Sequence, residues 1–317
     1  MKLKEIYEQA VRLGIEADVR GQAEIKRLLE QNQKEYEDLK GEDKPFYDQD
    51  RLFNPFGDTR VLHGDGEREI KTVLTGIDME VGEVLLADRL REKGRGIDLI
   101  LAHHPEGKAL AALHEVMHLQ EDMLYSLGVP INVAEGVMAS RISEVQRGIM
   151  PLNHNRAVNA AQILDLPLMC VHTPADNLVV RYLNQVFAEK QPFTVGEVVA
   201  ALKAIPEYQE ARKVKAGPEI TVGSEKRRAG KIYVDMTGGT SGAEVVYEKL
   251  AAAGVGTIIG MHMPEKHRTE AEKHHLNVII AGHIASDSLG LNLFLDSLEK
   301  NGLEIIPCSG LIRVHRV

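Results

Sequence analysis

The sequence lacks tryptophan, contains only two cysteines, and draws only 4% of its residues from the aromatic types. So few aromatic side chains offer little surface on which single-stranded bases could stack. Cys170 and Cys308 each lie beside an apolar run, and two cysteines cannot form a disulfide framework, so we interpret both as reduced core residues. No apolar segment near the start reaches the length of a signal peptide or a membrane span. We therefore expect a cytoplasmic protein that does not enter a membrane.

Basic residues are fewer than acidic ones: the sequence has 38 Lys and Arg and 47 Asp and Glu, which gives a formal net charge of −9. A non-specific grip on nucleic acid needs a concentrated basic surface, and the one basic run, residues 226–228, is too short to form it. The partner that we expect is a small-molecule substrate rather than a nucleic acid. The 317 residues, 44% of them hydrophobic, suffice for two domains or for one large duplicated domain.

One apolar run, residues 97–102, ends in His103, His104 and Pro105. Such a run predicts a buried strand whose carboxyl end, where open α/β sheets bind their ligands, presents two imidazoles. Neighbouring residues of a strand point to opposite faces, so the two histidines reach one metal only if the strand has ended, and two metals otherwise. The alternative is a pair of structural, hydrogen-bonded histidines.

The segments around this motif recur in the second half of the chain. A strand, a helix and a second strand ending in histidine occupy 72–78, 80–93 and 97–104 in the first copy, and 232–236, 243–252 and 257–262 in the second. Each copy is followed by an apolar strand and a His-x-x-x-Asp motif, His172 with Asp176 and His283 with Asp287. This repetition predicts an internally duplicated α/β fold with two mixed sheets, helices around them and a shared site between the halves.

The domain organisation follows from this repeat. Residues 1–55 begin with an amphipathic helical pattern and continue into a loop rich in Pro, Gly and Asp, which predicts an N-terminal helical extension. Residues 56–185 are the first α/β half, with a helical insertion at about 106–165. Residues 186–317 are the second half.

Five residues just past strand ends are the candidate metal ligands, namely His103, His104, Asp176, His283 and Asp287. Imidazole and carboxylate without thiolate disfavour a structural zinc site and suit Zn, Mn or Fe in an open, water-bearing site. Five ligands are too many for one catalytic zinc and fit two divalent ions bridged by carboxylate and water. Taken singly, each His-x-x-x-Asp motif is also what an ordinary histidine–carboxylate pair in a loop produces.

These motifs, together with Ile77-Asp78 and the glycine-rich run 238–242, resemble the Nif-three-like family (NGG-interacting factor three), often described as type 2 homologues of GTP cyclohydrolase I. The resemblance implies a duplicated α/β fold and a dinuclear metal centre held by the five residues above. It also implies ring-like homo-oligomers, commonly hexamers.

The resemblance has departures and gaps. The last acidic ligand in the family is normally Glu, whereas Asp287 is one methylene shorter, and Gly260-Met261-His262 replaces the family's usual Gly-Asp or Gly-Glu. The first 50 or so residues and about 106–165 and 180–230 are not covered. The insertion lies where it can roof the site, so relatives do not indicate the substrate.

The insertion contains His114-Glu115-Val116-Met117-His118, an H-E-x-x-H sequence. On one helix this spacing gives the two imidazoles and the glutamate of a zincin metalloprotease. The alternative is an ordinary amphipathic helix that buries Leu110, Leu113 and Met117 and carries the H-E-x-x-H residues by chance. We expect His118, like His172, to support the metal ligands through hydrogen bonds.

The function that this site favours is metal-dependent hydrolysis of a small molecule, such as a phosphoester, a nucleotide or a cyclic amide. Two metals lower the pKa of a shared water toward neutrality, so that metal-bound hydroxide is the nucleophile. The alternative function is that of a non-catalytic metal-handling or regulatory protein. A minor alternative is a zincin-like metalloprotease that uses His114, Glu115 and His118.

Overall fold

A computed structural model describes residues 1–316 of the chain. Its first sheet has the strand order β1-β4-β3-β2-β9, in which β1 is antiparallel to β4 and the other pairs are parallel. Its strands are β1 (Arg60–His63), β2 (Thr72–Gly76), β3 (Leu99–Ala102), β4 (Leu168–Cys170) and β9 (Glu304–Pro307). Every residue of β3 and β4 is buried, as the apolar runs in the sequence predict for central strands.

The second sheet has the order β5-β8-β7-β6, again with one antiparallel edge strand, β5. Its strands are β5 (Glu219–Val222), β6 (Lys231–Asp235), β7 (Val255–Gly260) and β8 (Asn277–Ile280). This order and these directions repeat β1-β4-β3-β2 of the first sheet. The predicted α/β fold with two mixed sheets is confirmed, and β9 joins the first sheet although it follows the second in the chain.

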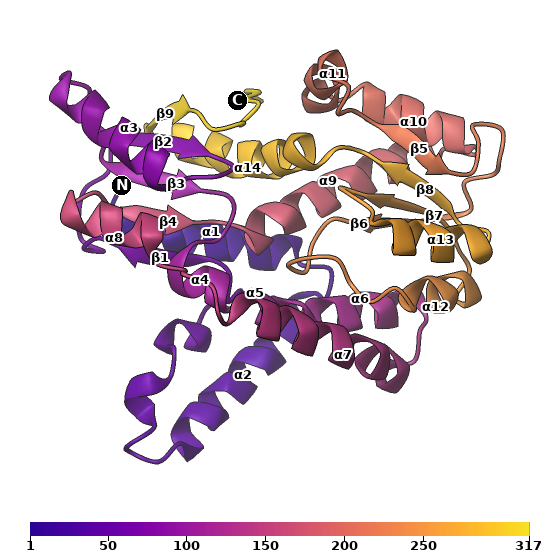
Figure 1. Cartoon of the computed structure of the whole chain (residues 1–317), viewed down its shortest axis with the longest axis horizontal. Helices are drawn as coiled ribbons and strands as arrows, with labels where there is room; N and C mark the ends of the chain where they lie inside the picture. The colour runs from indigo at the N-terminus through magenta and orange to yellow at the C-terminus, as the bar shows by residue number, and fades with distance from the viewer. Residues whose placement is uncertain (317) are drawn as a thin grey trace.

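Two long helices lie between the sheets, α9 (Thr173–Lys190) after β4 and α14 (His283–Glu299) after β8 (Figure 1). Residues of both helices belong to the core beneath each sheet. They approach so closely that a Cβ added at Gly290 would lie 2.2 Å from the backbone oxygen of Ala175. The two helices therefore form one shared layer, and the predicted acidic ligands lie near their N-terminal ends.

The other helices cover the outside of this layered body. They are α3 (Val81–Glu92) and α8 (Arg156–Ile163) on the first half, and α10 (Val195–Lys203), α11 (Pro206–Lys213), α12 (Val246–Ala252) and α13 (Glu265–Lys273) on the second. The inserted helices are α4 (Gly107–Ala111), α5 (Leu113–Val116), α6 (His118–Leu127) and α7 (Ile131–Ile149). Buried residues of α6 and α7 share one apolar core with strands and helices of the second half. An insertion in the first half thus packs on the second half.

The N-terminal helical extension consists of α1 (Leu3–Ala17), α2 (Gln22–Asp38) and the short 3-10 helices η1 (Lys44–Phe46) and η2 (Gln49–Leu52). Gly14 lies inside α1, where a Cβ would approach Pro174 to 2.7 Å. α1 therefore packs tightly on the start of α9. By contrast α2 projects away from the body (Figure 1), and only Ile25 and Asn32 of it are buried.

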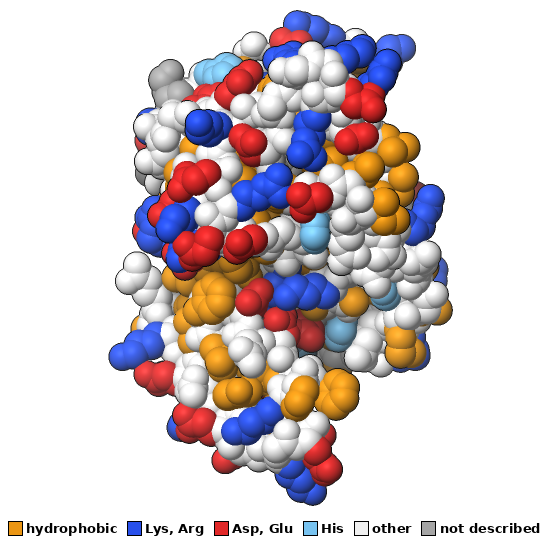
Figure 2. Space-filling model, turned by 90° about the vertical axis from the view of Figure 1, so that its left-hand side faces the viewer, with side chains coloured by type: hydrophobic (Ala, Val, Ile, Leu, Met, Phe, Trp, Pro, Cys, Tyr) orange, Lys and Arg blue, Asp and Glu red, His pale blue; other side chains and the backbone are white. Residues whose placement is uncertain are grey.

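The surface shows basic and acidic side chains interspersed on the face drawn in Figure 2, with no single large patch of one sign. None of the helices formed by residues 1–316 combines the length and hydropathy that a membrane-spanning segment needs. Both cysteines are free, Cys170 buried and Cys308 partly so. This agrees with their interpretation as reduced core residues.

Candidate metal centre

The three histidines of the first half meet because β3 and β4 are neighbouring parallel strands that end at one edge of the sheet. His103 is fully buried, and its Nδ1 lies 3.0 Å from the backbone oxygen of Val171. A carbonyl oxygen can only accept, so Nδ1 carries the proton and Nε2 keeps its lone pair. Burial also lowers the pKa of His103, which favours this neutral form.

His104 is held by a carboxylate from the next strand. Gly76 of β2 pairs with Ala102 of β3, so Asp78 and His104, each two residues further on, lie side by side. The Nδ1 of His104 lies 2.6 Å from Oδ1 of Asp78. Burial acts to lower the pKa of His104, but the nearby Asp287 and Asp78 carboxylates outweigh it and raise that pKa.

His172 is held in the same way from the other side. β1 runs antiparallel to β4 with Arg60 opposite Cys170, so Asp58 before β1 lies opposite His172 after β4. The buried Asp58 carboxylate accepts the Nδ1 proton of His172 at 2.7 Å and the Thr173 hydroxyl at 2.6 Å. All three imidazoles thus have Nδ1 bound to an acceptor and Nε2 directed elsewhere, the arrangement of histidines that bind metals.

The carboxylates that these Nε2 atoms face are Asp176 in the first turn of α9 and Asp287, the fifth residue of α14. Oδ1 of Asp176 and Oδ1 of Asp287 each lie 3.5 Å from Nε2 of His103. The other oxygen of Asp287, Oδ2, lies 3.4 Å from Nε2 of His104 and 3.5 Å from Nε2 of His283. The two oxygens of Asp287 therefore face different histidines.

Several of these atoms are buried without a hydrogen-bond partner. They are Nε2 of His103, Oδ1 of Asp176 and both carboxylate oxygens of Asp287. Buried polar atoms are rarely left unpaired in native proteins, so this cluster is incomplete as a purely structural network. Imidazole nitrogen and carboxylate oxygen are donors that divalent metals bind, and a cation here would complete them. The residues present fit a metal site.

The charges in the cluster are strongly coupled. Burial raises the pKa of Asp176 to about 8. For His172, the nearby Asp176 and Asp58 carboxylates outweigh burial and raise its pKa to about 9. The surrounding histidines overcome burial at Asp287 and hold its pKa well below the usual range. The metal-free cluster thus balances its carboxylates with protons on imidazoles, as a bound cation would do instead.

All five predicted ligands are brought together, in groups whose ligand atoms lie within 4.8 Å of one another. The groups are His103 with Asp176 and Asp287, His104 with His283 and Asp287, and His103 with His104 and His172. The predicted supporting residue His172 thus lies at the cluster.

The H-E-x-x-H sequence is not at the cluster. α5 ends and α6 begins around Met117, so His114 and His118 do not follow one another on an unbroken helix. His118 instead pairs with Glu121 at 3.0 Å and lines a separate cleft beside α2. Within residues 1–316, no group able to hold a metal contains His114 or His118.

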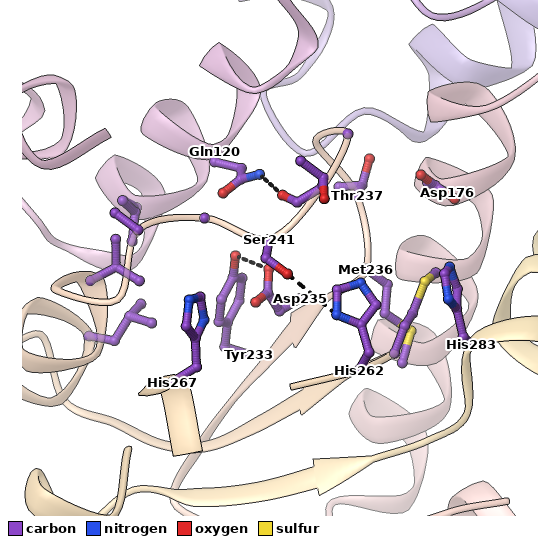
Figure 3. A pocket seen from close by; sticks show the side chains of 18 of the residues that line it. Gln120, Asp176, Tyr233, Asp235, Met236, Thr237, Ser241, His262, His267 and His283 are labelled. Carbon is purple, nitrogen blue, oxygen red and sulfur yellow. Dashed lines mark hydrogen bonds between the residues drawn. The ribbon is translucent and has the colours of Figure 1, made fainter. Parts of the chain in front are cut away.

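A cavity extends from the cluster into the second half of the molecule (Figure 3). His172, Asp176, His283 and Asp287 line one end of it, and Gln120 of α6 lines its roof. Gln120 donates hydrogen bonds of 2.7 Å to the backbone oxygens of both Gly238 and Thr240, which fixes the glycine-rich loop as the cavity wall. The insertion therefore roofs the site, as its position in the sequence predicts.

Among solved structures, a NIF3 superfamily protein from Sphaerobacter thermophilus matches with a TM-score of 0.72 and 28% identity, covering 80% of this chain and 92% of that one. This similarity supports a Nif-three-like family for the chain. Reduced HcgD from Methanocaldococcus jannaschii, with a TM-score of 0.50 and 17% identity over 78% of this chain and 87% of that one, shares the fold. No family model and no curated protein matches the sequence. The sequence-based family prediction is confirmed.

The sequence did not indicate two residues that hold the histidines. Asp78 was visible as the end of a strand beside the histidine strand, and parallel neighbours that end together could have indicated its contact with His104. Asp58 lies in a segment that reads as loop. Its contact with His172 depends on an antiparallel pairing more than 100 residues apart, for which the local sequence gives no signal.

Proposed function

We propose that this chain binds two divalent metal ions and acts as a metal-dependent hydrolase of a small molecule. The observation that carries the proposal is the position of Asp287. This nearly fully buried carboxylate belongs to two ligand groups, one with His103 and one with His104, and directs a different oxygen into each. A carboxylate shared in this way is the usual bridge of a two-metal site. The shorter side chain at the family's Glu position is therefore compatible with bridging.

The ligands would divide between the ions. His103 and Asp176 would hold one, His104 and His283 the other, and Asp287 both. Zn, Mn and Fe suit this donor set. Such ions supply a water of lowered pKa and polarise a substrate oxygen, which is the chemistry of hydrolysis. Asp58 and Asp78 hold the imidazoles in the ligand tautomer, and the adjoining cavity gives a substrate access.

Metal content is the first test. Elemental analysis of protein purified without chelator should find more than one equivalent per chain, and His103→Ala or His283→Ala should lower it. The matched control is His274→Ala, which changes a histidine of the second half outside every candidate metal group of the described residues. A wild-type protein that contains no metal and binds none on titration would refute the proposal.

Activity is the second test. The Mn, Zn and Fe forms should be screened against phosphoesters, nucleotides and cyclic amides, and turnover should vanish in His103→Ala. If every metal form is inert while the metal exchanges readily to an apo acceptor protein, the metal-handling function replaces the hydrolase.

We also infer that the two sheets are copies of one ancestral unit. The support is their common strand order with one antiparallel edge strand each, β1 and β5. The division into 1–55, 56–185 and 186–317 is proposed with it, except that β9 of the last part pairs with the first sheet. The proposed homo-oligomer, hexameric in the family pattern, would show in light scattering as a multiple of 35.1 kDa.

A further inference from the structure

The cavity beside the cluster has a second end that metal binding does not use. We call it the distal end, and its side chains come from the second sheet and the helices and loop around it (Figure 3). Its polar members are Tyr233, Asp235, Ser241, Tyr247, His262 and His267. Met236, Met261 and Leu250 supply apolar surface. A ligand that reaches the metal cluster from this cavity must have its other part against these side chains.

The charge of the lining is one-sided. Among the lining residues, all within the described part of the chain, there are three aspartates and no lysine or arginine. Arg141 lies nearby, but it donates its Nε proton to the backbone oxygen of Ser241 at 3.0 Å and pairs with Glu144 at 2.9 Å. A phosphate group is normally held by arginine, lysine or a helix N-terminus. The distal end offers a phosphate no side-chain cation.

Asp235 gives the distal end a specific hydrogen-bonding group. It ends β6, and its Oδ1 accepts the hydroxyl proton of Tyr233 at 3.0 Å. Its other oxygen, Oδ2, makes no hydrogen bond with any side chain or backbone group of residues 1–316. Burial raises the pKa of Asp235, so the site is poorly solvated. A partly buried carboxylate with one oxygen open to a cavity is suited to binding an N–H group.

The remaining polar groups are already paired with one another. Ser241 and His262 lie 3.3 Å apart between Oγ and Nδ1, and Tyr247 and His267 lie 3.2 Å apart between the hydroxyl and Nδ1. They present hydrogen-bonding groups to the cavity. A flat ring with N–H groups on one edge can donate a hydrogen bond to Asp235.

We infer that the part of the ligand in the distal end is an unphosphorylated nitrogen heterocycle or cyclic amide, uncharged or cationic, bound through a ring or exocyclic N–H by Asp235. This rests on the proposed function and narrows it, because it excludes ligands that place a phosphate in the distal end. For a ring that contains a cyclic amide, the reaction is hydrolysis of the amide C–N bond. The water oxygen bonds to the carbonyl carbon, the C–N bond breaks, and the nitrogen receives the proton, giving a carboxylic acid and an amine.

The test is calorimetric binding to wild-type protein freed of metal with a chelator, so that no bound ion can hold a phosphate. The probes are dihydrouracil and the matched pairs of each common nucleoside with its 5′-monophosphate. The unphosphorylated member that binds best should bind at least tenfold more tightly than its phosphate, because the phosphate has no cation to meet and lies near carboxylates. Equal or tighter binding of the phosphates overturns the inference, and so does the absence of binding by every ring N–H compound at millimolar concentration.

Variants locate the effect. Asp235→Asn should weaken binding of the best unphosphorylated probe at least tenfold and reduce its preference over the phosphate, with metal content unchanged. Tyr233→Phe should weaken it less, because it removes only the hydroxyl that orients the carboxylate. Glu248→Gln, an exposed carboxylate on α12, is the matched control and should bind as wild type does. Binding unchanged in Asp235→Asn overturns the inference.

The proposed hydrolase function and the inferred ligand class can be refuted independently of each other. Asp235-dependent binding of a heterocycle without turnover in any metal form contradicts the hydrolase and keeps the ligand class. Hydrolysis of a phosphoester that needs His103 but is unaffected by Asp235→Asn keeps the hydrolase and overturns the ligand class.

Discussion

Replacement of Asp287 by Asn tests the shared carboxylate most directly. The substitution keeps the volume of a side chain that is only 1% exposed and removes its charge and one of its two acceptor oxygens. Both oxygens face imidazole Nε2 atoms at 3.4 to 3.5 Å. An amide cannot serve both groups as an anionic ligand, so both metals should be lost or weakened together.

The expected size follows from what Asp287 supplies. It contributes one of the three members of each of two ligand groups. Removing even a hydrogen-bond partner of a metal ligand costs about 10–100-fold in affinity. Loss of a charged ligand should exceed the upper end of that range, and a hundredfold corresponds to about 2.8 kcal/mol at about 1.4 kcal/mol for each factor of ten.

The comparison variant is Asp287→Glu, which keeps the charge and adds one methylene. In so buried a position the extra volume should cost about 1–3 kcal/mol of stability, while metal occupancy is preserved or raised. Metal content by elemental analysis and affinity by chelator competition should be measured for wild type, Asp287→Asn and Asp287→Glu. Equal metal affinity in all three proteins would show that Asp287 is not a ligand.

Three further predictions follow from the packing and charge around the site. Asp58→Asn should lower the free energy of unfolding by about 1–3 kcal/mol, because a buried charged acceptor of His172 is lost; an unchanged urea midpoint would contradict this. Gly290→Ala should destabilise the protein by about 1–3 kcal/mol and weaken metal binding, because the added Cβ would separate α9 from α14. The control is Gly136→Ala on α7, which has open space around it and should stabilise the protein by up to about 1 kcal/mol. Burial raises the pKa of the Cys308 thiol to about 11, so the thiol stays neutral to higher pH. The rate of its alkylation should therefore rise roughly tenfold for each pH unit from 8 to 10. A rate that levels off near pH 8.5 would contradict this prediction.

The sequence predicted the parts of the site that local pattern controls. An apolar strand that ends in His103 and His104 indicates buried imidazoles at a sheet edge, and the repeated His-x-x-x-Asp motif indicates Asp176 and Asp287 at equivalent helix starts. The amphipathic pattern at the start of the chain likewise indicates the helix α1, which buries one apolar face that includes Leu3.

What the sequence could not supply depends on long-range pairing. Asp58 reaches His172 only through the antiparallel register of β1 with β4. The H-E-x-x-H match looked like a helical motif, but the helix is interrupted at Met117, which is buried in the core of the second half. Tertiary packing therefore decided both points, and neither appears in a local window of residues.

The pairing of β9 with β2 has a consequence for how the protein is made. It joins Thr72 to Glu304, 232 positions apart, whereas the second sheet uses only strands between residues 219 and 280. During synthesis the second sheet has all its strands before the first sheet does, which reverses the common order of N-terminal units folding first. Until residue 304 leaves the ribosome, the edge of β2 stays unpaired and open to another chain. Nascent chains of this protein should therefore keep that edge exposed until β9 has been synthesised.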